Sequence, residues 1–139
     1  MDNKLEYIQG DLVMVKESAL QFAKDKIFKV ISSLSGGFLK VVMLNDSSTT
    51  YSISNNAIRP IPLTSEILEK NGWRTQNRWY YYLDVAEGFI SYIGIDFKHK
   101  SNKGHLYVEV DGNNMVEIQY CHELQHFLFG LGLKQEMEV

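Results

Sequence analysis

The chain of 139 residues lacks several features that would place it in a definite functional class. It contains a single cysteine, Cys121, so it can form no internal disulfide and cannot build a zinc site from thiolates alone. No apolar run approaches the length of about 20 residues that a membrane-spanning helix requires. A net charge of −3 excludes a global basic field for nucleic acid or an anionic membrane, although a local basic patch is compatible with it.

The first residues also lack the apolar segment of a signal peptide. Asp2, Lys4 and Glu6 place charges where that segment would lie. Together with the single cysteine and the lack of a candidate membrane span, this start predicts a cytoplasmic protein without a membrane partner. The four histidines are too few for a His-rich metal-binding tract.

Short apolar runs separated by turn residues fill the N-terminal part of the chain. Hydrophobic residues make up 45% of the whole sequence, which is enough for a packed core. Turn signals stand at Gly10-Asp11, at 35–37 and at 45–48. Since a closed barrel leaves no edge among short strands, we expect residues 1–63 to form an SH3-like β-barrel. Its strands are expected at 12–15, 27–31, 38–44 and 49–53.

A different pattern follows in residues 64–139, which we expect to form the second domain. Its first element is a short linking helix over 64–70, with Thr64 as N-cap and Gly72 as the residue that ends it. An antiparallel sheet packed with one C-terminal helix, over 122–131, completes it. The fold class is therefore α+β, with two lobes that could also form one compact unit. Strands are expected at 77–84, 89–97, 106–110 and 116–120, and the tail 134–139 could add an edge strand.

The expected C-terminal helix contains the sequence His122-Glu123-Leu124-Gln125-His126, which has the HExxH pattern of zinc metalloproteases. Residues four apart share a face of a helix, so His122 and His126 could hold one metal ion. Glu123 would then act as the general base on a metal-bound water. The motif thus predicts an alternative function, a zinc-dependent hydrolase with zinc as its cofactor.

Three observations favour a helix that carries no metal and no catalytic residue. A catalytic zinc needs a third protein ligand, and Phe129 and Gly132 stand where the longer form of the motif has Gly and His. Cys121 directly precedes His122, so it points in another direction around the helix. The apolar side of the helix predicts that both histidines face away from the core. That side is made by Leu124, Phe127, Leu128 and Leu131.

A binding surface can be predicted from the same helix and from an aromatic strand. In the run 79–82, alternate side chains point to opposite sides of the strand, and we expect Tyr80 and Tyr82 to be the exposed pair. If the polar side of the helix is exposed, it adds a contact patch for a partner. That patch is made by His122, His126 and Phe129.

A basic cluster supplies a second alternative, a nucleic-acid-binding protein. Lys98, Lys100 and Lys103 lie near Trp79 in the sequence, and basic groups beside aromatic rings are typical of surfaces that bind single strands. The acidic overall charge favours a solvated hairpin loop at this place instead.

Three stretches of the sequence carry a resemblance. They are Gly10 to Val13, the run Arg59 to Gly72, and the run Tyr120 to His126 followed by Leu131 and an acidic tail. Together they resemble a group of proteins of no assigned activity from Bacteroides and other Bacteroidetes, often encoded among prophage and mobile-element genes. The resemblance covers most of the chain. It implies that the last motif position is often Asn and that the Glu varies, so His126 completes HExxH incidentally.

These patterns favour a non-catalytic binding or accessory protein that acts through protein–protein contacts. The sequence does not identify the protein partner or the oligomeric state. The zinc-dependent hydrolase and the nucleic-acid-binding protein stay as alternatives.

Overall fold

The computed structural model describes residues 7–16, 26–44, 46–85 and 88–139. The chain forms two compact units. The first unit contains the chain up to Ile61 together with Leu124–Met137, and the second contains Pro62–Glu123 together with Glu138–Val139. The division after Ile61 lies close to the predicted boundary after residue 63. The segment Leu124–Met137 differs from the prediction, because it belongs with the N-terminal strands rather than with the C-terminal sheet.

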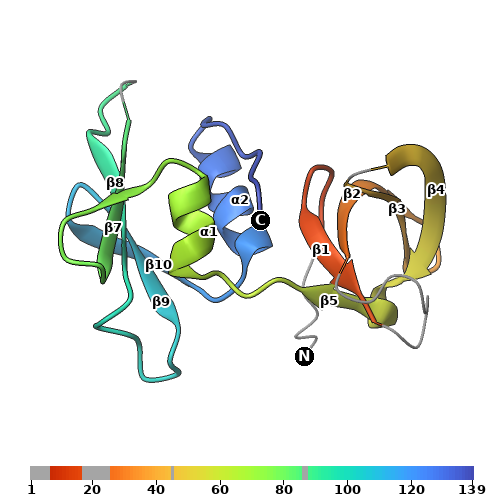
Figure 1. Ribbon diagram of the computed structural model, residues 1–139, viewed down its shortest axis with the longest axis horizontal. Helices are drawn as coiled ribbons and strands as arrows, with labels where there is room; N and C mark the ends of the chain where they lie inside the picture. Colours follow the sequence, from red (N-terminus) through yellow and green to blue (C-terminus); the bar gives the residue numbers. More distant parts are fainter. Residues whose placement is uncertain (1–6, 17–25, 45, 86–87) are drawn as a thin grey trace. The chain divides into compact units, whose positions relative to one another are not determined.

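The first unit is built on a five-stranded antiparallel sheet with the order β4-β3-β2-β1-β5 (Figure 1). A 3-10 helix, η2 (Asn55–Ala57), precedes the last strand, and the Ser54 hydroxyl accepts a hydrogen bond from its Asn56 N–H. Among the described residues β4 and β5 are the two edges and do not pair with each other, so the sheet is not a closed barrel. The strands are β1 (Leu12–Val15), β2 (Ile27–Leu34), β3 (Phe38–Met43), β4 (Asp46–Ser54) and β5 (Ile58–Pro60).

Alternation along these strands produces the core of the first unit. Val13 and Phe28 lie opposite each other across β1 and β2, and both are fully buried. Side chains at alternate positions face the same side of a sheet, so their neighbours two residues along join the same cluster. Tyr51 packs edge-on against Phe28, with 6.1 Å between ring centroids. The cluster comprises Tyr7, Val13, Val15, Phe28, Val30, Leu39, Val41, Ile53 and Ile58.

The second unit contains an antiparallel meander with the order β10-β9-β8-β7-β6. Asp111 (φ 51°) and Gly112 (φ 87°) join β9 to β10 in a tight hairpin, the turn that the sequence predicts there. One side of the sheet is buried and includes Tyr81, Ile93 and Val108. The strands are β6 (Arg74–Thr75), β7 (Tyr80–Asp84), β8 (Tyr92–Asp96), β9 (Leu106–Val110) and β10 (Asn113–Ile118).

Both predicted helices are present. In α1 (Ser65–Lys70), Thr64 Oγ1 accepts a hydrogen bond from Ile67 N–H, and Gly72 follows with φ +83°. The second helix, α2 (Cys121–Gly130), ends in a paired hydrogen-bond closure, with Gly132 N–H to Phe129 O and Leu133 N–H to Leu128 O. The structure therefore confirms the α+β class with two antiparallel sheets.

The tail 134–139 forms no strand, and the expected edge strand is wrong. Its backbone is held by side-chain amides instead: Gln135 O accepts a hydrogen bond from Gln125, and Glu138 exchanges two hydrogen bonds with the Asn71 amide. No helix among the described residues is both long and apolar enough to span a membrane.

Candidate functional site

Glu123 of the HExxH motif caps its own helix. Its Oε1 accepts hydrogen bonds from Gln119 N–H at 2.8 Å and Tyr120 N–H at 2.9 Å. Because Tyr120 directly precedes the helix, Glu123 occupies the position from which a glutamate reaches back in a capping box. A negative side chain in the first turn also interacts favourably with the helix dipole. These bonds give the carboxylate a structural role.

His122 lies in the interior and not on an exposed patch. Its residue is 1% exposed, and its ring stacks on that of Tyr120 with 6.0 Å between centroids. The prediction of an exposed contact patch that includes His122 is therefore wrong. The buried arc of α2 is wider than the apolar stripe suggests, since Cys121 and Gln125 are buried as well. Burial raises the pKa of the Cys121 thiol to about 12, which keeps it protonated near neutral pH.

The other two polar residues of the motif bind the start of β1. Gln125 is 1% exposed, and its Oε1 accepts a hydrogen bond from Leu12 N–H at 3.0 Å. Its Nε2 donates to Gly10 O at 3.0 Å and to Gln135 O at 3.1 Å. A single amide side chain thus satisfies three backbone groups, from two segments of the first unit.

His126 lies 2.7 Å from the buried carboxylate of Asp11, measured from Nε2 to Oδ2. The same Oδ2 accepts a hydrogen bond from Ile8 N–H at 2.8 Å. Burial raises the pKa of Asp11, while the hydrogen bonds from Ile8 and His126 act in the opposite direction. A carboxylate and an imidazole, two kinds of group that can bind a metal, therefore lie next to each other at Asp11 and His126. Within the described part of the chain, however, no group of three His, Cys, Asp or Glu side chains is placed to hold a metal.

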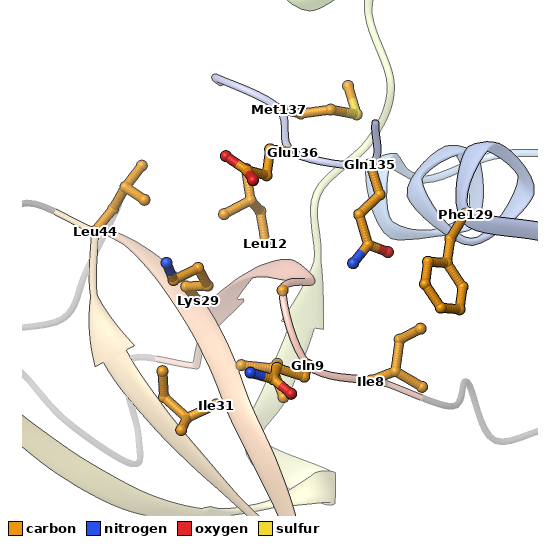
Figure 2. A pocket seen from close by; sticks show the side chains of 12 residues that line it. Ile8, Gln9, Leu12, Lys29, Ile31, Leu44, Phe129, Gln135, Glu136 and Met137 are labelled. Atoms are coloured by element: carbon orange, nitrogen blue, oxygen red, sulfur yellow. The ribbon is translucent and has the colours of Figure 1, made fainter. Parts of the chain in front are cut away.

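Phe129, the third residue of the predicted helix patch, borders a groove of about 790 Å³ in the first unit (Figure 2). Its side chain remains exposed, as do those of Ile8 and Leu44 on the same groove. Lys29 and Glu136 add one charge of each sign to the lining. The groove is therefore mainly apolar and has no preference of charge.

The outer side of the second sheet carries a row of tyrosines, which we call the tyrosine face. The strand register shows that alternate residues of β7, β8, β9 and β10 point to this side, which is opposite to the side of the buried Tyr81. Tyr80 and Tyr82 both lie on this side, as the alternation in 79–82 predicts, but both are partly buried rather than exposed as expected. The tyrosines of this face are Tyr80, Tyr82, Tyr92 and Tyr107.

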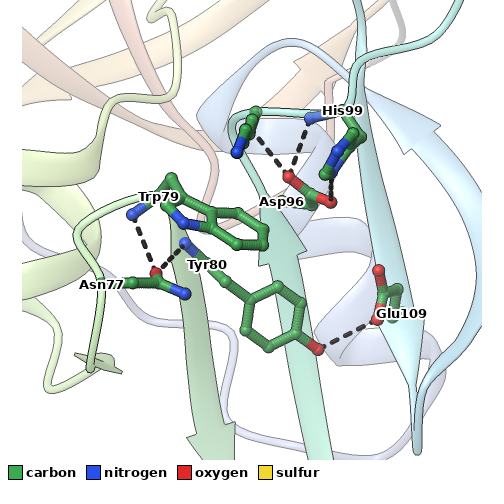
Figure 3. Close-up of polar contacts among 7 residues, drawn as sticks. Asn77, Trp79, Tyr80, Asp96, His99 and Glu109 are labelled. Atoms are coloured by element: carbon green, nitrogen blue, oxygen red, sulfur yellow. Dashed lines mark hydrogen bonds and ion pairs between the residues drawn. The ribbon is translucent and has the colours of Figure 1, made fainter.

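Tyr80 lies across β8 at Gly94, which supplies no side chain to block it. A Cβ at position 94 would overlap the Tyr80 hydroxyl. The ring can therefore reach β9, where its hydroxyl donates a hydrogen bond to Glu109 Oε1 at 2.9 Å (Figure 3). Burial, followed by Glu109 and Tyr92, raises the pKa of Tyr80 above its usual value. The ring thus has a fixed position, with a neutral hydroxyl beside a carboxylate.

Tyr82 is held by a guanidinium group. Arg74 of β6 stands opposite Tyr82 in the register, and its Cζ lies 5.1 Å from the centroid of the tyrosine ring. The same guanidinium forms an ion pair with Asp84, two residues further along β7. Next to this arrangement a pocket of about 340 Å³, the tyrosine pocket, opens on the face. It is lined by Gln76, Asn77, Tyr80, Tyr82, Asp84 and Tyr92.

The lysines of the predicted nucleic-acid surface lie at and after the end of β8. Lys98 Nζ lies 5.3 Å from the Trp79 ring centroid. The ring of His99 packs edge-on against Trp79, and Figure 3 shows both residues near Asp96. Asp96 fixes this turn by accepting hydrogen bonds from the N–H groups of Lys98 and His99. Burial opposes its ionisation, but these bonds and that of the His99 ring lower the pKa of Asp96 overall. Lys100 and Lys103 are exposed, so the structure brings one of the three lysines onto an aromatic ring.

Comparison with protein-family models, with curated proteins and with solved structures gives no match.

Several residues of these sites were not identified from the sequence. Gln125 carried a usable signal, because it lies between Leu124 and Leu128 of the predicted apolar side, and a polar residue buried on a packed helix needs hydrogen-bond partners. Tyr92 and Gly94 also alternate with buried Ile93 in their strand. Arg74, Asp11 and Glu109 carried no local signal, since each acquires its role from a residue on another element.

Gln125→Ala should lower the free energy of unfolding by about 2–4 kcal/mol, because it leaves buried backbone groups of Gly10 and Leu12 without partners. Urea denaturation measures the loss, and hydrogen exchange at the Leu12 amide localises it. The exposed Gln119→Ala serves as the control, with an expected change under about 0.5 kcal/mol. Slow exchange of the Leu12 amide in Gln125→Ala would contradict the assigned role.

Gly94→Ala should destabilise the second unit by about 1–3 kcal/mol, because the added methyl displaces the Tyr80 ring. The cost should disappear when Tyr80→Ala has already emptied the space. Urea unfolding followed by the fluorescence of Trp73 and Trp79 gives the four free energies of this double-mutant cycle. Equal costs in the two backgrounds would show that Tyr80 does not lie across Gly94.

Proposed function

We propose that the protein is a non-catalytic binding module that contacts a protein partner through the tyrosine face. The observation that supports this is the open tyrosine pocket, in which contacts within the chain hold two of the tyrosine rings in place. Glu109 fixes Tyr80, and Arg74 fixes Tyr82. Tyrosine supplies a large contact area at a low cost in side-chain entropy, and a preorganised ring costs still less to immobilise.

We further propose that the first unit is an SH3-like barrel. In support, five short antiparallel strands surround one apolar cluster, and β5 returns to lie beside β1. Such a return brings the last strand next to the first, as in a small, partly open barrel, and among the described residues β4 and β5 remain as its two edges. The proposed setting is a cytoplasmic accessory protein encoded by a prophage or mobile element, on the strength of the resemblance in sequence.

The partner can be captured by cross-linking purified protein in a lysate of its source organism. Tyr82→Ala and Tyr92→Ala should each reduce recovery of a specific cross-linked protein about five- to tenfold, as loss of a central aromatic anchor usually does. Phe129→Ala is the matched control, because it removes an exposed aromatic ring from the groove of the first unit. Loss of the partner in Phe129→Ala alone would move the binding surface to that groove.

The hydrolase alternative is tested by zinc content and by cleavage of a fluorogenic peptide library. We expect far less than one zinc per chain and no turnover. Glu123→Gln is a sharp variant, because glutamine keeps the capping geometry and removes the general base. About one zinc per chain that His126→Asn removes, with turnover that Glu123→Gln abolishes, would replace the binding module with a zinc hydrolase.

The nucleic-acid alternative is tested by titration with single-stranded DNA and RNA. Binding that falls steeply with salt and that requires Lys100 and Lys103 would support it. We expect neither, since Lys98 is already placed on Trp79 and the overall charge is acidic.

A further inference from the structure

Carboxylates outnumber cationic groups on the tyrosine face. Register places Asp84, Glu109 and Glu117 on the same side of the sheet as the tyrosines. The register also places Arg74 of β6, a cationic residue, on this side, opposite Tyr82. Tyrosine rings have electron-rich faces, so rings and carboxylates together favour a positively charged ligand.

Arg74 shows how this surface accommodates a cation. Its guanidinium stands over the Tyr82 ring and pairs with the Asp84 carboxylate. Both Tyr82 and Asp84 also line the tyrosine pocket, together with Tyr80 and Tyr92. One side of the pocket is thus already an arginine-binding arrangement, formed within the chain.

We propose that the tyrosine pocket takes an arginine side chain from a basic segment of the partner. The incoming guanidinium stacks on the tyrosine rings and pairs with Asp84, in place of or beside Arg74. A planar guanidinium suits stacking and a two-point contact with a carboxylate better than the compact ammonium of lysine. This inference rests on the proposed function and names the chemical class of its ligand.

The probe is an acetylated and amidated peptide, Gly-Arg-Gly-Arg-Gly, titrated into the ¹⁵N-labelled full chain. The matched peptide has citrulline in place of arginine, which keeps the shape of the side chain and removes its charge. We expect shift changes at the amides of Tyr82, Tyr92 and Gly94, with the citrulline peptide binding at least about fivefold more weakly. A lysine peptide should fall between the two.

Variants separate the local effect from the overall charge. Asp84→Asn and Tyr82→Ala should each weaken binding of the arginine peptide about three- to tenfold. Glu66→Gln makes the same change in net charge on an exposed residue of α1, and it should leave the affinity unchanged. Arg74→Gln should tighten binding about two- to fivefold, because it frees Tyr82 and Asp84 from the internal guanidinium.

Equal affinity for the arginine and citrulline peptides would overturn the inference, and so would the absence of shifts in these amides of the folded protein. Equal weakening by Glu66→Gln and Asp84→Asn would also overturn it, because binding would then follow net charge alone. If partner capture still depends on Tyr82 in any of these cases, the proposed function stands without the arginine preference. If capture is insensitive to Tyr82→Ala, the proposed function itself fails.

Discussion

The first unit depends on a buried amide that reaches it from near the end of the chain. Gln125 satisfies Leu12 N–H and Gly10 O, which lie 113 and 115 positions earlier. Its loss would leave those backbone groups unpaired in the interior, which costs more than an ordinary hydrogen bond contributes. The N-terminal strands are therefore completed by a segment more than a hundred positions further along the chain. Such non-local contacts slow folding, because the chain loses loop-closure entropy before the contact forms.

This dependence gives the HExxH sequence a physical explanation without a metal. Glu123 starts the helix as a cap, and His122 stacks in the interior. Gln125 then accepts a hydrogen bond from Leu12 at the start of β1, and His126 contacts the Asp11 carboxylate just before it. Gln125-His126 and the run from Gly10 to Leu12 are thus partners in space.

Local signals were enough to predict both helices and most strands, but not β5 or β6, and they wrongly predicted a strand in the tail 134–139. Thr64 and Gly72 bound α1 as predicted, because caps act within one turn of the residues that they terminate. Alternation placed the strands, and it separated Tyr81 from Tyr80 and Tyr82. The grouping of the segment after Glu123 with the first unit could not be predicted in this way. It follows from hydrogen bonds to residues more than a hundred positions away, which leave no periodic trace in the sequence.

The arrangement on the tyrosine face is not required by the core beneath it. Tyr81 and Ile93 already bury the inner side of β7 and β8, so the outward rings are not needed to fill it. Arg74, whose guanidinium stands over the Tyr82 ring, forms an ion pair with the solvent-exposed Asp84. Exposed ion pairs of this kind contribute little to stability. The absence of a side chain at Gly94 makes room for the Tyr80 ring, although a glycine weakens a strand. The proposed binding function would account for this loss, because aromatic rings that are already fixed on the outer side of a sheet cost less to immobilise against a partner.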